Sequence, residues 1–210
     1  SYAEIELAIV RPAWRRDARL VAWTRGRDDA LIRFTAPPRD AGTATLKVGD
    51  DLWTWNPRLR RVIRLPDSLL GQSWAGTDFS YGDLARSDDL LRHYSLRLGS
   101  VEALAGGLEA RHIVAIPHPE APVVWGREHL TVRSDHVLLE HVFYDQDGFA
   151  LKRLETLEIR ELDGRPVPAR MRMSRLDETG HYTELSYVEL DFGVAVDDDT
   201  FTQFRLREGA

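Results

Sequence analysis

The stretch that decides the fold is residues 72–84, which read QSWAGTDFSYGDL. This segment carries the aromatic residues Trp74, Phe79 and Tyr81 and has no regular alternation of apolar and polar residues. It lies between two long blocks of sequence that do alternate. An irregular segment of this length inside a compact domain usually has a function as a lid, a plug or a binding loop. We therefore expect it to cover a surface that the flanking blocks build.

Both flanking blocks predict antiparallel strands, because apolar and polar residues alternate with a period of two. The runs before the segment are residues 4–9, 18–23, 30–35, 44–48, 53–55 and 61–65, and those after it are 93–98, 108–116, 129–133, 137–144, 151–161, 169–176 and 182–190. Turn residues such as Asp147-Gly148 and Asp163-Gly164 separate the runs, and Asp-Gly between alternating segments is a strong hairpin signal.

Short helices are expected around the irregular segment and at the C-terminus. The first covers residues 68–72 with Asp67 or Ser68 as its cap, and the second covers residues 81–91 with Ser80 as its cap. A terminal helical turn is expected at residues 197–202.

Many of the expected strands carry apolar residues on both faces, as residues 19–23 do. A large sheet of this kind tends to curl or close, and it must cover both faces or keep one for binding. The sequence therefore predicts a mainly β fold: a curled antiparallel sheet, an unclosed half-barrel of about ten to twelve strands. Short helices would plug its concave face, and residues 1–210 would form a single domain.

Composition excludes several classes of function. The chain has 210 residues, 43% hydrophobic residues and a net charge of −6, with 28 basic and 34 acidic residues interspersed. Nucleic-acid binding needs a concentrated basic face, so it is not expected. The chain has no cysteine, which excludes disulfides and cysteine-based metal sites. No apolar run approaches the roughly 20 residues of a transmembrane helix. The start at Ser1 without Met is interpreted as a processed N-terminus from which a signal peptide was removed.

No catalytic, metal or cofactor motif is present. The sequence lacks G-x-S-x-G, phosphate-binding glycine loops and H-E-x-x-H, and its histidines are scattered. Residues Asp145 to Gly148 resemble the first half of a calcium loop, but the following Phe149 suits a hairpin better. We therefore predict no catalytic residues, no metal and no cofactor.

The apolar candidates for a ligand cavity and its lid come from both the strands and the irregular segment. They are Trp23, Ile32, Phe34, Leu46, Trp53, Trp55, Trp74, Phe79 and Tyr81. The sharpest form of this prediction is that the rings of Trp74, Phe79, Trp53 and Trp55 border one cavity. Ordinary core packing is the alternative. An acyl chain would suit such a cavity, because burial yields about 0.8 kcal/mol per CH₂ without specific polar chemistry.

Arginines cluster in the first block, and Arg25, Arg33 and Arg61 are candidates for the rim of such a cavity. There they would meet lipid phosphates or an acidic partner. The alternative is a solvated face paired with nearby aspartates.

The order of these motifs resembles a known family. Residues 72–84 are similar to the Q-S-[FW]-x-G-[ST]-D-[FY]-[ST]-Y-x-D-L run of outer membrane lipoprotein-sorting proteins of the LolA-like superfamily. The resemblance continues through Leu52 to Pro57, Tyr144 to Gly148 and the closing Asp199-x-Phe201.

The resemblance implies an unclosed antiparallel barrel with a hydrophobic cavity under helical plugs. It also implies a periplasmic, non-enzymatic carrier or chaperone for the acyl chains of lipids or lipoproteins. An inner-membrane exporter and an outer-membrane acceptor are its candidate partners.

Two other functions stay open at this point. One is a periplasmic domain that senses lipid-derived ligands and acts on a regulatory protein partner. The other is a hydrolase with an unrecognised site. A lipid that stays bound during purification would favour the carrier or the sensor over the hydrolase.

Overall fold

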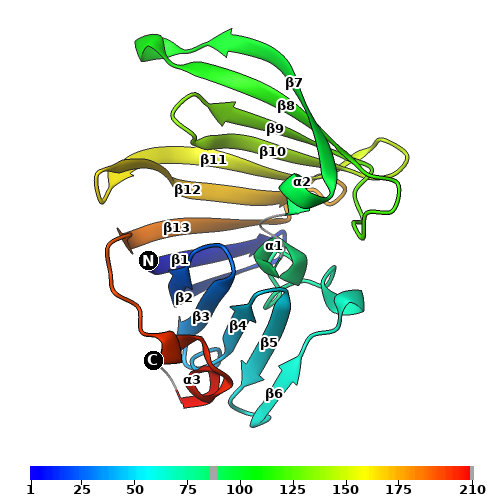
Figure 1. Cartoon of the computed structure of the whole chain (residues 1–210). Helices are drawn as coiled ribbons and strands as arrows, with labels where there is room; N and C mark the ends of the chain where they lie inside the picture. The colour runs from blue at the N-terminus through cyan, green and yellow to red at the C-terminus, as the bar shows by residue number, and fades with distance from the viewer. Residues whose placement is uncertain (86–88, 209–210) are drawn as a thin grey trace. The chain divides into compact units, whose positions relative to one another are not determined.

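The computed structural model describes residues 1–85 and 89–208. It is mainly β, with thirteen antiparallel strands in a sheet that is not closed, and a few short helices (Figure 1). The predicted fold class is confirmed, although the strands number thirteen instead of ten to twelve. The chain divides into two compact units: a first unit of Ser1–Ile9, Arg15–Ser87 and Leu185–Ala210, and a second unit of Val10–Trp14 and Asp88–Glu184.

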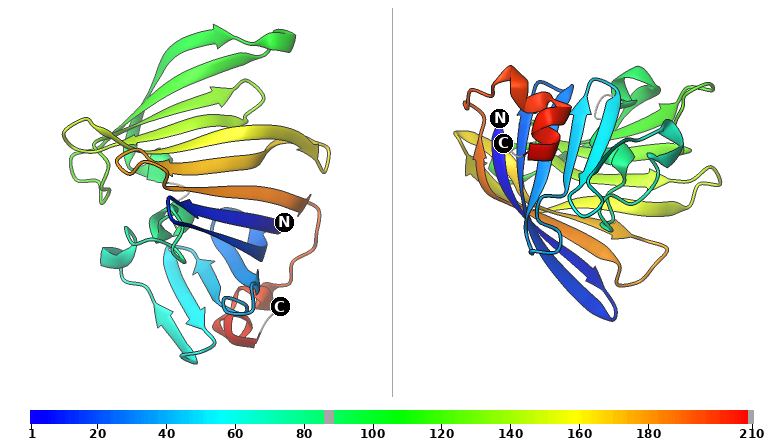
Figure 2. Two further views of the ribbon diagram at one scale, coloured as in Figure 1. Left: turned by 180° about the vertical axis from the view of Figure 1, so that it is seen from behind. Right: turned by 90° about the horizontal axis from the view of Figure 1, so that it is seen from below.

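The first unit contains a meander, drawn from blue to cyan in Figure 1 and seen from two further sides in Figure 2. Its strands are β1 (Tyr2–Arg11), β2 (Trp14–Arg25), β3 (Asp29–Ala36), β4 (Ala44–Val48), β5 (Asp51–Asn56) and β6 (Arg61–Arg64), and they neighbour one another in this order. Strand β13 (Tyr182–Asp191) adds its C-terminal half. Each strand falls where the alternation predicted one.

The two faces of this meander have separate apolar cores. The ladder register aligns Ile32 with Thr45 and Thr45 with Thr54, so these residues share one face. It aligns Leu31 with Leu46 and Leu46 with Trp53 on the other face. Because neighbouring residues of a strand point to opposite faces, this register decides which residues can meet.

The second unit is also a meander. It contains β7 (Tyr94–Ala103), β8 (Glu109–Pro117), β9 (Arg127–Arg133), β10 (Leu138–Tyr144), β11 (Ala150–Leu162), β12 (Arg165–Arg175) and the start of β13. The β11–β12 hairpin turns at Asp163 and Gly164, whose φ angles are +47° and +70°. Two consecutive positive φ angles define the type I′ turn that the Asp-Gly pair predicted.

The helices are short. The first unit has the 3₁₀ turns η1 (Asp67–Leu69) and η3 (Asp198–Phe201) and the helices α1 (Tyr81–Ala85) and α3 (Gln203–Glu208), and the second has α2 (Asp89–Arg92) and η2 (Ala105–Gly107). The helix expected at 68–72 is a single 3₁₀ turn, and the one expected at 81–91 is α1 and α2, with residues 86–88 outside the described residues. Helix α3 was not predicted. None of the described helices is long and apolar enough to cross a membrane.

The predicted caps have different outcomes. The cap predicted for α1 is confirmed: Ser80 Oγ accepts from the Asp83 N–H at 3.1 Å, and Asp83 Oδ2 accepts from the Ser80 N–H at 2.6 Å. This pair is a capping box that satisfies two N-terminal amides of the helix. The predicted caps Asp67 and Ser68 are wrong, because η1 begins after Pro66 without a side-chain cap.

The single-domain prediction leads to a measurement. Strands β1, β2 and β13 each contain residues of both units. A strand cannot melt in one unit and persist in the other without breaking within its own ladder, so we expect one cooperative thermal transition. Calorimetry checks this, with the calorimetric and van't Hoff enthalpies expected to agree; two separate transitions would contradict it.

Candidate functional site

The irregular segment folds into a compact loop, which we call the plug (residues 70–85). At its tip Trp74, Ala75, Gly76 and Thr77 form a turn in which the Thr77 N–H donates to the Trp74 carbonyl at 2.9 Å. Ala75 and Gly76 have φ angles of +51° and +75°, which is the type I′ pattern. Glycine adopts this conformation freely, whereas an alanine pays a steric cost there.

Hydrogen bonds inside the plug hold the sides of the loop together. The Trp74 N–H donates to the Phe79 carbonyl at 2.8 Å, and the Tyr81 N–H donates to the Gln72 carbonyl at 3.1 Å. The Gly82 N–H donates to the Leu70 carbonyl at 2.7 Å. The plug therefore satisfies much of its backbone hydrogen bonding internally.

Trp74 anchors the plug on the meander of the first unit. Only 4% of its surface is exposed, and its ring lies 5.4 Å from that of Phe34. The indole N–H donates to Thr45 Oγ1 at 3.1 Å, which satisfies the one polar group of the side chain. Phe79 is half-buried in the same cluster.

The cluster under the plug is apolar. It joins residues of β1, β2 and β3 to the plug and to the first-unit half of β13: Ala3, Ile5, Leu7, Ala18, Leu20, Ala22 and Phe34 are buried, with Ile32, Phe79, Tyr81, Leu185 and Tyr187 packed around them. We call this surface the plug face. If the plug opened, the plug face would lose its apolar cover.

Arg16 holds the tip of the plug from strand β2. Its Nη2 donates to the carbonyl of Ala75, and its Nε is buried without a hydrogen-bond partner. Arg16 lies in line with Ala18 and Leu20, so a cation stands at the end of the plug face. Sequence reasoning missed this residue, although a charge that continues a row of buried apolar positions is a signal that could have found it.

The base of the plug rests on a smaller cluster. Leu52 of β5, Leu70 and Ala85 are buried together, with Leu65 and Tyr81 packed against them. Tyr81 touches both clusters and so connects the base of the plug with the plug face.

Burial raises the pKa of the Tyr81 phenol above its usual value. The unfolded chain ionises this phenol near pH 10, so the contribution of Tyr81 to stability is full below about pH 10 and is lost as the pH rises further. We expect Tyr81→Phe to flatten the fall in unfolding free energy above about pH 10. Urea titrations at a series of pH values measure this, and an unchanged slope would contradict the placement of Tyr81.

The nine predicted cavity residues do not form one set. Ile32, Phe34, Trp74, Phe79 and Tyr81 belong to the plug face. Trp23, Leu46, Trp53 and Trp55 belong to a cluster on the other face of the meander, which the buried Phe201 and Leu206 of the C-terminal segment cover. The expectation of one cavity bordered by Trp74, Phe79, Trp53 and Trp55 is therefore corrected, because the ladder register sends the two pairs to opposite faces.

The predicted rim arginines are also separated. Arg33 Nη2 donates to the carbonyls of Arg205 and Leu206 at 2.6 and 3.2 Å, and burial lowers the pKa of its guanidinium. Arg33 therefore caps helix α3.

Arg25 and Arg61 lie elsewhere on the first unit. Arg25 forms ion pairs with Asp29 and Asp198. This arrangement is the alternative to a cavity rim, a solvated face on which arginines pair with nearby aspartates. Arg61 is exposed on β6. These arginines do not form one rim.

The described residues contain no group of three His, Asp or Glu side chains placed to hold a metal ion. At the suspected calcium loop, Asp145 Oδ1 accepts from the N–H groups of Asp147 and Phe149 at 3.0 and 2.8 Å. The carboxylate thus shapes a hairpin turn, as the alternative reading held.

A family model described as "Uncharacterized protein" matches residues 26–208. A search of curated proteins finds no match.

Solved structures share the fold. A DUF1329 family protein from Desulfovibrio piger is similar with a TM-score of 0.86 and 24% identity, covering 98% of this chain and 90% of its own. A domain from Vibrio parahaemolyticus described as an outer membrane lipoprotein-sorting protein has a TM-score of 0.84 and 23% identity, with the same coverage. A LolA superfamily protein from Nitrosomonas europaea has a TM-score of 0.77 and 21% identity, covering 97% and 90%. The chain therefore belongs to the family of the matching model, and its fold is that of the outer membrane lipoprotein-sorting proteins of the LolA-like superfamily.

Proposed function

We propose that this protein is a periplasmic carrier that binds the acyl chains of lipids or lipoproteins and passes them toward the outer membrane. The observation that carries the proposal is the plug: an internally hydrogen-bonded loop that covers an apolar sheet face with Trp74 and Phe79. The lipoprotein-sorting description of one structural neighbour supports the same direction.

The plug face has the chemistry that an acyl chain needs. Its buried members are aliphatic and aromatic side chains, and the indole of Trp74 already has a partner in Thr45. An acyl chain of about 14 carbons gains on the order of 10 kcal/mol on burial before entropy costs. Exposing one large buried apolar side chain to water costs about 1.5 to 3 kcal/mol. An acyl chain that displaces Trp74 from Phe34 can therefore offset the free energy lost when Trp74 is exposed.

Release requires that the plug opens more easily than the sheet. Two side-chain hydrogen bonds connect the plug to the strands: Arg16 donates to the Ala75 carbonyl, and the Trp74 indole donates to Thr45. The strands themselves are joined by continuous backbone ladders. Local opening is favoured where few buried contacts and few backbone bonds must break. The residues between Gly71 and Gly82 are expected to open while the strands stay paired.

Displacement of a fluorescent fatty-acid probe tests the proposal. The purified protein is expected to bind the probe at a saturable site and to release it when an unlabelled fatty acid or a lipoprotein-derived acyl peptide is added. Hydrogen exchange run in parallel should show that the amides of Trp74, Thr77 and Tyr81 change their protection when the probe binds. If the wild-type protein binds no acyl probe, the carrier proposal fails.

A further inference from the structure

Arg16 is a half-buried cation at the end of the plug face, and no carboxylate of the described residues pairs with it. Its Nη2 donates to the Ala75 carbonyl at the tip of the plug. Its Nε is buried and has no hydrogen-bond partner among the described residues. A buried donor without an acceptor is unfavourable, and so is a partly buried cation without a counter-ion. The closed plug therefore leaves Arg16 in need of an anionic acceptor.

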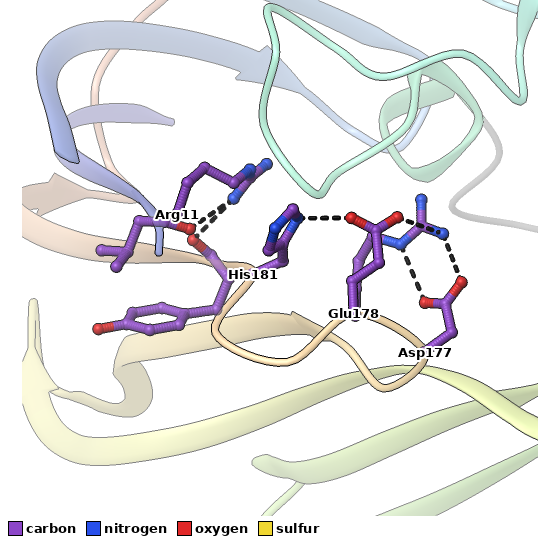
Figure 3. A network of polar contacts seen from close by, with 7 residues as sticks. Arg11, Asp177, Glu178 and His181 are labelled. Atoms are coloured by element: carbon purple, nitrogen blue, oxygen red, sulfur yellow. Dashed lines mark hydrogen bonds and ion pairs between the residues drawn. The ribbon is translucent and has the colours of Figure 1, made fainter. Parts of the chain in front are cut away.

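The arginines near Arg16 in the sequence differ from it, because each of them already has acceptors. Figure 3 shows Arg11, whose Nη1 donates to the carbonyls of Val10 and Tyr182 at 2.7 and 3.3 Å. The other two form ion pairs: Arg15 with Asp17 at 2.8 Å and Arg19 with Glu6 at 3.0 Å. Arg16 is thus the arginine of this part of the chain that has a buried donor to offer.

The unpaired Nε lies on the edge of the guanidinium that suits an anion. Nε–H and one Nη2–H point in the same direction and match two oxygens of a carboxylate or a phosphate. In Arg16 this edge carries the unpaired Nε and the Nη2 that donates to Ala75. When the plug opens, as the carrier proposal requires, the Ala75 carbonyl moves away and both donors of the edge lose their cover. An anionic group can then occupy the edge.

The plug face places this cation in line with an apolar row. Arg16, Ala18, Leu20 and Ala22 share one face of β2, and the last three are buried in the plug-face cluster. A strand rises about 3.3 Å per residue, so the row from Arg16 to Ala22 is about 20 Å long. An extended acyl chain can lie along this row with its head group at Arg16. A neutral head group there would leave the cation without a counter-ion.

We propose that Arg16 binds the anionic head group of the acyl ligand, a carboxylate or a phosphate. The protein then selects anionic amphiphiles over neutral ones that have the same chain. This inference rests on the carrier proposal and deepens it, because it names the class of cargo and the residue that selects it.

The test compares ligands that share an oleoyl chain and differ in the head group. Displacement of a fluorescent fatty-acid probe gives the affinities of oleate and its methyl ester, and those of lysophosphatidic acid and monooleoylglycerol. At a pH at which both acids are ionised, the wild-type protein should bind an anionic ligand at least about tenfold more tightly than its neutral counterpart, as expected for a charge-assisted bidentate contact. A preference in either pair supports the proposal, and the pair that shows it identifies the head group.

Variants of Arg16 show whether the preference comes from this residue. Arg16→Gln should bring the two affinities of a pair to within about twofold of each other, because the charge is gone. Since the preference compares two ligands on one protein, a change in plug opening affects both and cancels. Arg16→Lys keeps the charge without the planar edge and should keep part of the preference. Arg19→Gln is the matched control: it removes an exposed, ion-paired arginine of the same strand and should keep the full preference.

A measurement on the wild-type protein supports the comparison of variants. In nitrogen NMR spectra of the arginine side chains, the Nε–H resonance of Arg16 should shift when oleate is added and stay in place when the methyl ester is added. Circular dichroism verifies that each variant is folded.

Some results would overturn the head-group role and leave the carrier proposal intact. They are equal affinities of the wild type for anionic and neutral ligands, an unchanged preference in Arg16→Gln, equal losses of preference in Arg16→Gln and Arg19→Gln, and an Arg16 resonance that responds equally to oleate and its methyl ester. If the wild type binds none of the four ligands, the carrier proposal fails and the head-group role fails with it.

Discussion

Replacing Trp74 with glutamate is expected to weaken binding of a fatty-acid probe at least about tenfold while the sheet stays folded. Trp74 is 4% exposed and packs on Phe34, so a closed plug would bury the new carboxylate in an apolar cluster. A buried unpaired charge is strongly penalised, and the plug can no longer close over a bound chain. The strand ladders do not involve residue 74 and should remain.

The matched control is Leu69→Glu. Leu69 is 39% exposed in η1, immediately before the plug, so the same charge there meets solvent. Probe displacement, with thermal unfolding run alongside, should separate the two variants. Probe binding that is unchanged in a folded Trp74→Glu protein would remove the plug from the mechanism.

Replacing Arg16 with leucine is expected to open the plug. The guanidinium donates to the Ala75 carbonyl at the tip of the turn, and a hydrogen bond from a charged group contributes about 1.5–3 kcal/mol. Its loss should raise the open population of the plug by about ten- to a hundredfold. Hydrogen exchange at the Thr77 and Tyr81 amides reports this population.

Arg19→Leu is the control for Arg16→Leu. Arg19 lies on the same strand, but it is exposed and pairs with Glu6. Its loss should leave exchange in the plug unchanged, because exposed ion pairs contribute little. Equal exchange in the Arg16 and Arg19 variants would show that the Ala75 contact does not hold the plug.

Strand positions could be read from the sequence, because alternation is a local property. The runs at residues 30–35, 44–48 and 53–55 all became strands, and Asp163-Gly164 became the expected turn. The burial of Trp74 could also be predicted, since an aromatic residue in an irregular segment between apolar strands is expected to pack on an apolar surface.

The division of the aromatic residues between two faces could not be read in the same way. The two-residue Gly49-Asp50 turn pairs Leu46 with Trp53, so these two share a face. Whether Leu46 and Trp53 also share a face with Phe34 depends on the connection at residues 37–43, which sets the register between β3 and β4. A shift by one residue exchanges the faces, and the pattern of residues 30–48 does not fix it.

The C-terminal cover was missed for a related reason. Phe201 and Leu206 pack on Leu31 and Leu46, more than a hundred and fifty positions earlier in the chain. Arg33 then caps α3 through the carbonyls of Arg205 and Leu206. Such long-range contacts leave no local pattern, so the sequence made Arg33 a candidate for the cavity rim instead of a helix cap.

The central claim is that the plug face binds an acyl chain, and native mass spectrometry of the protein purified from a bacterial envelope tests it most directly. The account predicts a mass increase that corresponds to bound lipid, and extraction of that lipid should yield an acyl chain. The bound fraction should fall in Trp74→Glu and stay unchanged in Leu69→Glu. A wild-type protein that carries no lipid, and that gains none when incubated with fatty acid, would contradict the account.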